Sequence, residues 1–171
     1  MRLFLFLIVS ANLLFSNPLE FKTFKSDFIQ KITNEENSTI TYKGSFYATS
    51  DAKALWIYNT PVKKSIYFKK DRVLIIEPEL EQVIVTTLKK SPNLAQIIKS
   101  AKKIDKNRYE ASFDDTIYHL TIKNNLLQSI SYTDKLGNKT KITLLNQEKD
   151  IPLDETLFKP KIPKDYDIIS E

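Results

Sequence analysis

The hydrophobic pattern of the chain begins with a helical period. Between Pro18 and Ile32, apolar side chains recur at steps of three and four, at Phe21, Phe24, Phe28 and Ile32. Charged residues lie between them, so the spacing predicts an amphipathic helix with an aromatic face. Pro18 suits the first turn of such a helix. The helix would pack on a sheet or cover an apolar cavity, and the pattern alone leaves both open.

From Ser38 onward the period becomes two, which is typical of half-buried strands. Asp114-Asp115, Asn124-Asn125 and Gly137 mark turns between later runs. Strands that follow one another without intervening helices favour an antiparallel meander. The expected strands are 38–48, 54–58, 65–68, 73–77, 82–88, 108–113, 116–123, 126–133 and 139–146, with a short further run at 155–158.

One more helix interrupts this meander. We expect Ser91 as its N-cap, Pro92 in its first turn and Lys103 as its end. Its apolar face would consist of Leu94, Ala95, Ile97, Ile98 and Ala101. These elements predict a mainly β (α+β) domain over residues 17–171. It would be a strongly curved, unclosed antiparallel β-barrel with an α-helical lid, made of both helices, over its open side.

Residues 1–16 have the layout of a secretory signal peptide, with Arg2, an apolar run and Ser16 at a suitable cleavage point. A membrane anchor is the alternative, but Ser10 and Asn12 interrupt the run, and a span needs about 20 apolar residues. We therefore expect an exported, soluble protein in a bacterial periplasm. Cleavage would remove one basic residue and lower the formal charge from +5 to 5 − 1 = +4.

The composition argues against an enzyme. Among its 171 residues the chain has no cysteine, one histidine and two glycines. These counts exclude disulfides, thiolate chemistry, a histidine-rich metal site and a glycine-rich phosphate loop. His119 lies within a predicted strand and is interpreted as structural. We therefore expect no catalytic residue, no metal and no cofactor.

Two charged groups allow a functional and a structural interpretation. Glu77, Glu79 and Glu81 could hold a cation, but exposed edge charges that discourage strand pairing are the simpler explanation. The basic positions 63, 64, 69, 70 and 72, with a pI near 9.2, could contact phosphates. An exported protein rarely meets nucleic acid, so we interpret them as turn and edge charges.

A cavity for an apolar ligand remains as the favoured function. The chain contains ten phenylalanines and eight tyrosines, and 42% of its residues are apolar. A curved sheet under a helical lid offers a groove that water enters poorly. Acyl chains need such shelter, because each buried CH2 is worth about 0.8 kcal/mol. The periodicity by itself leads no further than a β-rich periplasmic protein that binds an apolar ligand.

Six short segments resemble those of the LolA family of periplasmic outer-membrane lipoprotein carriers. They lie in the same order and span nearly the whole chain after residue 16. They are TFKSDFIQKI (23–32, with Phe24, Phe28 and Gln30), GSFY (44–47), Trp56 with Tyr58 and Pro61, LIIEPELEQV (74–83), SPNL (91–94) and LDETLFKPKIPKDYDII (153–169). Each segment is weak alone, but the ordered series is specific.

The resemblance implies an unclosed β-barrel with a helical lid around a hydrophobic cavity, and no cofactor. It also implies that acylated lipoproteins are the cargo of a monomeric carrier. An inner-membrane lipoprotein-releasing ABC transporter would supply them, and an outer-membrane acceptor lipoprotein would receive them. The anchored acceptor LolB has a similar fold but needs a lipidated cysteine, which this chain lacks. The alternative function is a periplasmic module that binds another apolar or acylated ligand, such as a glycolipid or peptide.

Strand parity and the helix faces give the candidate lipid-binding residues, which would otherwise simply pack as core. They are Phe21, Phe24, Phe28, Ala54, Trp56, Tyr58, Ile66, Phe68, Leu74, Ile76, Val83, Val85, Leu94, Ile97 and Ile98.

The chain departs from the family at the position of the lid latch. Many members carry a basic residue and a proline where this sequence has Ser50 and Asp51. An aromatic and basic pair is common where Ala54-Leu55 stands. Since the basic residue helps to latch the lid in the family, we expect a weaker or differently bonded lid here.

Overall fold

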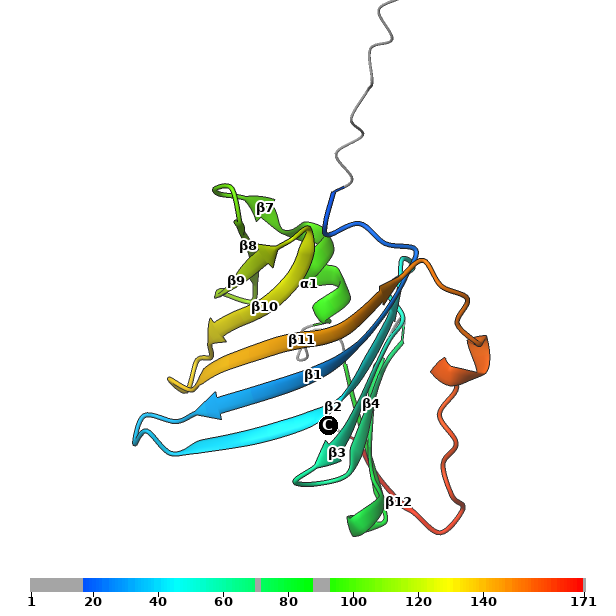
Figure 1. Ribbon diagram of the computed structural model, residues 1–171. Coiled ribbons are helices and arrows are strands. Elements are labelled where there is room, and N and C mark those ends of the chain that lie inside the picture. Colours follow the sequence, from blue (N-terminus) through cyan, green and yellow to red (C-terminus); the bar gives the residue numbers. More distant parts are fainter. Residues whose placement is uncertain (1–16, 70–71, 88–92, 171) are drawn as a thin grey trace, which may run out of the picture.

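The computed structural model describes residues 17–69, 72–87 and 93–170 (Figure 1). The expected signal peptide, Ser91 and Pro92 lie outside these ranges. Twelve strands form one sheet in the order β12-β6-β5-β4-β3-β2-β1-β11-β10-β9-β8-β7. The strands are β1 (Thr23–Thr33), β2 (Thr39–Thr49), β3 (Ala54–Thr60), β4 (Lys64–Phe68), β5 (Arg72–Glu77), β6 (Gln82–Thr87), β7 (Lys102–Lys103), β8 (Arg108–Phe113), β9 (Thr116–Lys123), β10 (Leu126–Thr133), β11 (Lys139–Lys149) and β12 (Asp167–Ser170).

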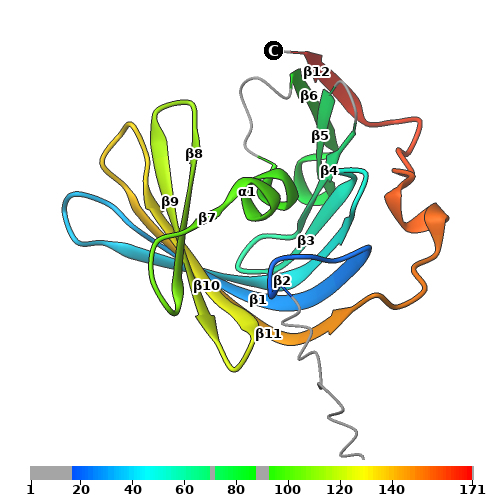
Figure 2. The same ribbon diagram turned by 90° about the horizontal axis from the view of Figure 1, so that it is seen from above.

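The sheet is curved and unclosed, as expected. All neighbouring strands are antiparallel except β12, which lies parallel to β6, and β12 and β7 end the sheet at opposite edges. Seen from above, β3–β6 lie on one side of α1 (Leu94–Ser100) and β8–β10 on the other (Figure 2). The helix therefore occupies the hollow of the sheet, which is the place of a lid or plug. No helix among the described residues is long and apolar enough to cross a membrane.

The helix predicted over residues 18–32 is wrong, because this segment forms the central strand β1. Phe24, Ser26, Phe28 and Gln30 are all buried, so the burial period is two. A step of four from Phe24 to Phe28 fits a helix and a strand equally well. Ser26 and Gln30 are polar but lie on the buried face, so the strand period could not be seen in the pattern of apolar residues. Ser26 is buried because its hydroxyl donates to the carbonyl of Leu145, 2.8 Å away on β11.

The helix predicted through Lys103 exists but is shorter. It ends at Ser100, and Ala101 turns to extended backbone with ψ 131°. Lys102 and Lys103 then form β7 by pairing with β8. Asn93 is the N-cap, since its side chain accepts a hydrogen bond from the Ala95 N–H. In the described part of the chain, α1 is the sole α-helix, so one helix covers the hollow instead of two.

The other predicted strands are confirmed, with small changes at their ends. Asp114, Asp115, Asn124 and Asn125 have positive φ values between 46° and 64°, which suits tight hairpin turns between β8, β9 and β10. The short run at 155–158 is a 3-10 helix, η3 (Glu155–Phe158). The Asp154 side chain caps it by accepting from the Thr156 N–H. A second 3-10 turn, η1 (Pro78–Leu80), joins β5 to β6.

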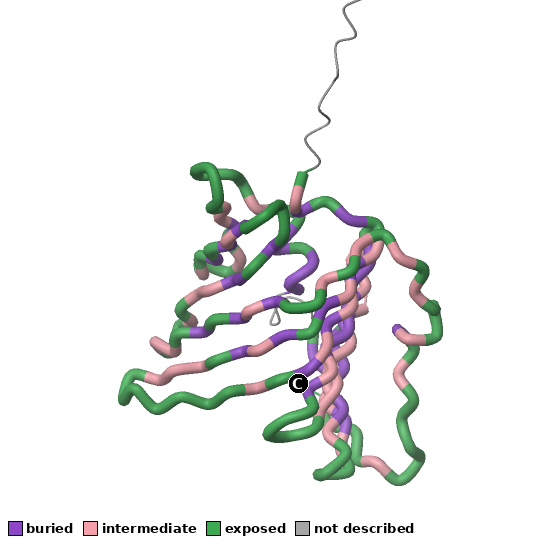
Figure 3. Tube along the Cα trace, viewed as in Figure 1, coloured by how far each residue is buried: buried purple, intermediate pink, exposed green. Residues whose placement is uncertain are grey.

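Buried positions alternate along the strands (Figure 3). The main core cluster combines the concave faces of both sides of the sheet with the apolar face of α1. A second, smaller cluster belongs to β5 and β6, and Tyr166 of the C-terminal tail (residues 150–170) packs against it. The sheet is therefore covered by α1 on one face and, at β5 and β6, by the tail on the other.

Candidate ligand-binding cavity

An apolar cavity of about 210 Å³ lies between α1 and the concave face of the sheet. We call it the inner cavity. Strands from both sides of the sheet contribute to it, together with the helix. Its lining consists of Gln30, Trp56, Tyr58, Ile66, Phe68, Val73, Ile75, Leu94, Ile97, Tyr118, Tyr132 and Ile142.

Aromatic rings build one wall of this cavity. The ring of Phe28 meets that of Trp56 edge-on at a centroid distance of 4.7 Å and that of Tyr58 at 5.1 Å. Phe46 supports Trp56 from β2, with the ring centroids 4.5 Å apart. Each such pair adds about 0.5–1.5 kcal/mol beyond the area it buries. The wall is therefore held in shape by its own ring contacts.

Polar groups gather at one part of the lining. The Tyr58 hydroxyl donates to Oε1 of Gln30 over 3.0 Å. Burial raises the pKa of Tyr58 well above its usual value and that of Tyr118 to about 12, and it also raises the pKa of Tyr132. All three hydroxyls stay protonated at neutral pH. The Lys64 ammonium lies 4.8 Å from the centroid of the Tyr58 ring, so a cation adjoins this polar part.

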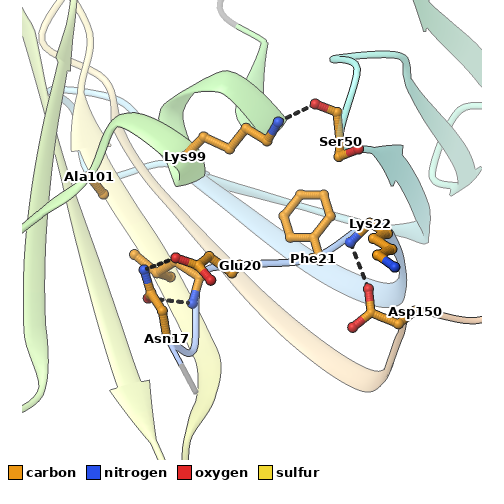
Figure 4. A pocket seen from close by; sticks show the side chains of 9 residues that line it. Asn17, Glu20, Phe21, Lys22, Ser50, Lys99, Ala101 and Asp150 are labelled. Atoms are coloured by element: carbon orange, nitrogen blue, oxygen red, sulfur yellow. Dashed lines mark hydrogen bonds between the residues drawn. The ribbon is translucent and has the colours of Figure 1, made fainter. Parts of the chain in front are cut away.

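The helix α1 is tethered to the loop between β2 and β3 (residues 50–53), which we call the β2–β3 loop. Asn93, only 1% exposed, donates from Nδ2 to the carbonyl of Ala52 over 2.8 Å. At the other end of the helix, the Lys99 ammonium donates to the carbonyl of Ser50 (Figure 4). Both tethers therefore run from the helix to the main chain of the loop.

The predicted latch position, Ser50, takes part in one of these tethers. It accepts through its main-chain carbonyl, and the cation is Lys99 of α1. The Lys99 side chain borders a second pocket of about 450 Å³, where Phe21 and Lys22 lie opposite the helix (Figure 4). The expectation of a weaker or differently bonded lid stays a prediction.

The β2–β3 loop is itself braced. The Thr49 hydroxyl donates to Asp51 over 2.5 Å and thereby lowers the pKa of that carboxyl. Lys53 pairs with Asp51 at 3.2 Å and with Glu155 of the tail at 2.9 Å. Ala52 has a φ of 69°, which is rare for a residue with a Cβ. The loop is thus held in one shape that presents its carbonyls to α1.

Of the predicted lipid-binding residues, six line the inner cavity: Trp56, Tyr58, Ile66, Phe68, Leu94 and Ile97. Four more are buried in the core cluster around it without lining it, namely Phe24, Phe28, Ala54 and Ile98. Phe21 also belongs to that cluster, but it lines the second pocket beside Lys99.

Four predicted residues lie on the opposite face of the sheet, so the placement predicted for them is wrong. They belong to the second cluster, beneath Tyr166 of the tail, and are Leu74, Ile76, Val83 and Val85.

The strand register explains this error. Phe68 pairs with Val73, and Ile66 pairs with Ile75. Side chains directly opposite each other in an antiparallel pair share a face. Because Phe68 and Ile66 line the inner cavity, Val73 and Ile75 do so as well, and Leu74 points the other way.

Six further residues, which strand parity did not indicate, line the cavity: Gln30, Val73, Ile75, Tyr118, Tyr132 and Ile142. On β9, Tyr118, Leu120 and Ile122 alternate with more exposed residues. This alternation could have identified the buried face of that strand from the sequence. Gln30 was hidden by the helical interpretation of its segment.

The histidine and Glu77, which the sequence offered for catalysis or metal binding, have partners outside the inner cavity. The exposed His119 pairs with Glu110 across β8 and β9, with Nδ1 3.0 Å from Oε1. Glu77 accepts a hydrogen bond from Gln82 at 2.6 Å. Within the ranges that the structure describes, no group of three or more histidines and acids could hold a metal ion.

A family model described as "Outer membrane lipoprotein carrier protein LolA" matches residues 20–122. The chain belongs to this family. It is 42% identical over 168 residues to an outer-membrane lipoprotein carrier protein of Campylobacter jejuni, covering 98% of each chain. A carrier of the same description from Helicobacter pylori is 32% identical over 147 residues, covering 86% of this chain and 78% of its own.

Solved structures support the fold. A LolA superfamily protein from Nitrosomonas europaea matches with a TM-score of 0.51 at 11% identity, over 81% of this chain and 90% of that one. An uncharacterised conserved protein from Thermus thermophilus gives a TM-score of 0.55 at 9% identity, over 90% and 93%. The LolA family consists of carriers, so the expectation of a non-enzymatic binding protein is confirmed.

Proposed function

We propose that this protein carries lipoproteins through the periplasm, with their acyl chains held in the inner cavity. The observation that carries the proposal is an apolar cavity partly covered by the short helix α1, which has two hydrogen-bonded tethers. An inner-membrane lipoprotein-releasing ABC transporter is the proposed donor, and an outer-membrane acceptor lipoprotein is the proposed recipient. The family and its curated relatives support this assignment.

The size of the cavity implies that α1 moves when cargo binds. At about 210 Å³ the inner cavity is below the range of about 300–1,000 Å³ usual for ligand pockets. Leu94 and Ile97 of the helix form part of its lining. Acyl chains therefore enter by displacing these side chains, and the lost packing of the helix is offset by the burial of the chains. A helix that is bound loosely enough to move also permits release.

Ile97→Glu tests the cavity directly. Ile97 is 3% exposed and faces the inner cavity, so a carboxylate there would be buried among apolar groups and acyl chains. We expect lipopeptide binding to be lost while the sheet remains folded, as measured by titration of a fluorescent triacylated lipopeptide and by circular dichroism. Gln96→Glu is the matched control, since Gln96 is exposed on the same helix. Normal lipoprotein transfer by Ile97→Glu would count against the proposal.

A further inference from the structure

The side chain of Gln30 stands in the lining of the inner cavity, together with three tyrosines, and has a hydrogen-bonding group to spare. Gln30 lies on the central strand β1 and is only 8% exposed. Phe28 precedes it on the same face, and Ile142 is its partner on β11. A buried amide in such surroundings is unfavourable unless its donor and acceptor find partners.

The oxygen of this amide is satisfied and its nitrogen is not. The Tyr58 hydroxyl donates to Oε1 of Gln30 over 3.0 Å, which fixes the plane of the amide. Among the described residues, Nε2 of Gln30 donates to no acceptor, and the side chain lines the inner cavity. Nε2 has no partner among the described residues, but it is not enclosed by protein atoms either. It is therefore accessible from the cavity that the side chain lines.

Two other amides show that this is not a general feature of the chain. The fully buried Asn93 uses both ends of its side chain, accepting from the Ala95 N–H and donating to the Ala52 carbonyl. The nitrogen of Gln147 donates to the carbonyl of Leu127 over 2.8 Å, whereas its Oε1 is enclosed without a partner. Gln30 differs from both, because its free group is a donor and its side chain lines the inner cavity.

We propose that Nε2 of Gln30 donates a hydrogen bond to an ester or amide carbonyl at the head of an acyl chain of the cargo. This inference rests on the proposed carrier function and adds the chemical group that the cavity recognises. Every acyl chain begins with a carbonyl, which accepts hydrogen bonds and donates none. Gln30 offers the complementary donor, while Trp56, Phe68 and Ile97 surround the hydrocarbon that follows.

The cavity therefore distinguishes acyl chains from plain alkyl chains. An ether-linked chain of equal length buries the same hydrocarbon but has no carbonyl, and its ether oxygen is a weaker acceptor for Nε2 of Gln30. A poorly paired buried donor weakens binding, and we expect a difference of about tenfold between the two ligands.

The test compares two synthetic ligands on the purified protein. One is a cysteinyl lipopeptide with two ester-linked palmitoyl chains and an acetylated amine. The other carries hexadecyl ether links in place of both esters and the same acetylated amine, so that neither ligand has a charged nitrogen at its lipid end. The wild type should bind the acylated peptide about tenfold more tightly. Gln30→Met keeps the size of the side chain but removes the donor, so the ratio of the two affinities should fall to about one, with the affinity for the ether ligand retained.

Two variants separate this effect from a general loss of structure. Gln147→Met makes the same change outside the inner cavity and should keep the wild-type ratio. Tyr58→Phe removes the hydroxyl that orients the Gln30 amide and should lower the ratio as well. Should Gln30→Met fail the circular-dichroism check, Tyr58→Phe decides the question.

The possible outcomes distinguish the inference from the function on which it rests. A tenfold preference that persists in Gln30→Met overturns the inference. Equal affinities in the wild type also overturn it but leave the carrier function standing. A wild type that binds neither ligand removes the carrier function itself.

Discussion

At the scale of single residues, Gly44 shows how the packing of β1, β2 and β3 depends on a missing side chain. A Cβ at this position would lie 1.8 Å from the carbonyl oxygen of Ile57 and 2.9 Å from Cε1 of Phe28. The register between β2 and β3 shifts here as well, between Lys43 and Gly44. Glycine therefore allows the two strands and the Phe28 ring to approach closely, which supports the aromatic wall of the inner cavity.

Gly44→Ala should destabilise the protein by about 1–3 kcal/mol or more, as overpacking of a core does. The midpoint of urea unfolding should fall with little change in its slope. Phe28→Leu, added to Gly44→Ala, should not restore the loss, because the nearest obstacle is the backbone carbonyl of Ile57. A Gly44→Ala variant as stable as the wild type would show that β3 is not packed as closely as described.

The residues of the inner cavity were predictable only in part. Trp56 and Tyr58 were placed correctly from their parity, although Leu55 and Ile57 make the other face of β3 apolar as well. The β5 sequence RVLIIE is apolar on both faces of the strand, and the C-terminal tail covers its outer face. Strand parity therefore could not show which face of β5 lines the cavity. Gln30 was not recognised as a lining residue, since the helical interpretation of its segment hid the strand parity that it shares with Phe24 and Phe28.

At the scale of elements, β1 and α1 show the limits of local pattern. The segment of β1 satisfies a helical period, and it becomes a strand because β2 and β11 pair with it on both sides. The pairing with β11 joins residues that are far apart in the sequence, which a local period cannot reveal. The helix α1 was predicted from its apolar face, but the position of its C-terminal end was not. The helix ends at Ser100 because Lys102 and Lys103 pair with β8 as strand β7.

The helix α1 has seven residues, too few for a helix to be stable alone in water. Its position therefore depends on its apolar contacts and on its tethers to the β2–β3 loop. Lys99→Met removes one tether, and we expect a bound fluorescent lipopeptide to dissociate about fivefold faster, as for the loss of about 1 kcal/mol. Stopped-flow displacement by unlabelled lipopeptide measures this rate.

Ser50→Ala is the contrasting variant for this experiment. Ser50 accepts the Lys99 hydrogen bond through its main-chain carbonyl, which the substitution keeps. Its dissociation rate should equal that of the wild type. An unchanged rate in Lys99→Met, or an equal acceleration in both variants, would contradict the tether between α1 and the loop.

At the scale of the whole molecule, the structure is an open, curved sheet with one helix in its hollow. This architecture was predictable, since many alternating strands and an amphipathic helix leave few other ways to bury the apolar faces. The covering of β5 and β6 by the tail was not, because β12 pairs in parallel with β6 and follows a proline-rich segment without a strand-like period. The outer cluster of β5 and β6 is therefore the part of the architecture that only the structure reveals.

The central claim is that the inner cavity carries acylated lipoproteins, and the most direct test is to identify what the protein binds in the cell. The protein would be isolated from periplasm without detergent, and the bound molecules identified by mass spectrometry, with Ile97→Glu purified in parallel. We predict triacylated polypeptides with the wild type and their absence from Ile97→Glu. Recovery of glycolipids or unmodified peptides alone, or the same molecules with both proteins, would contradict the account.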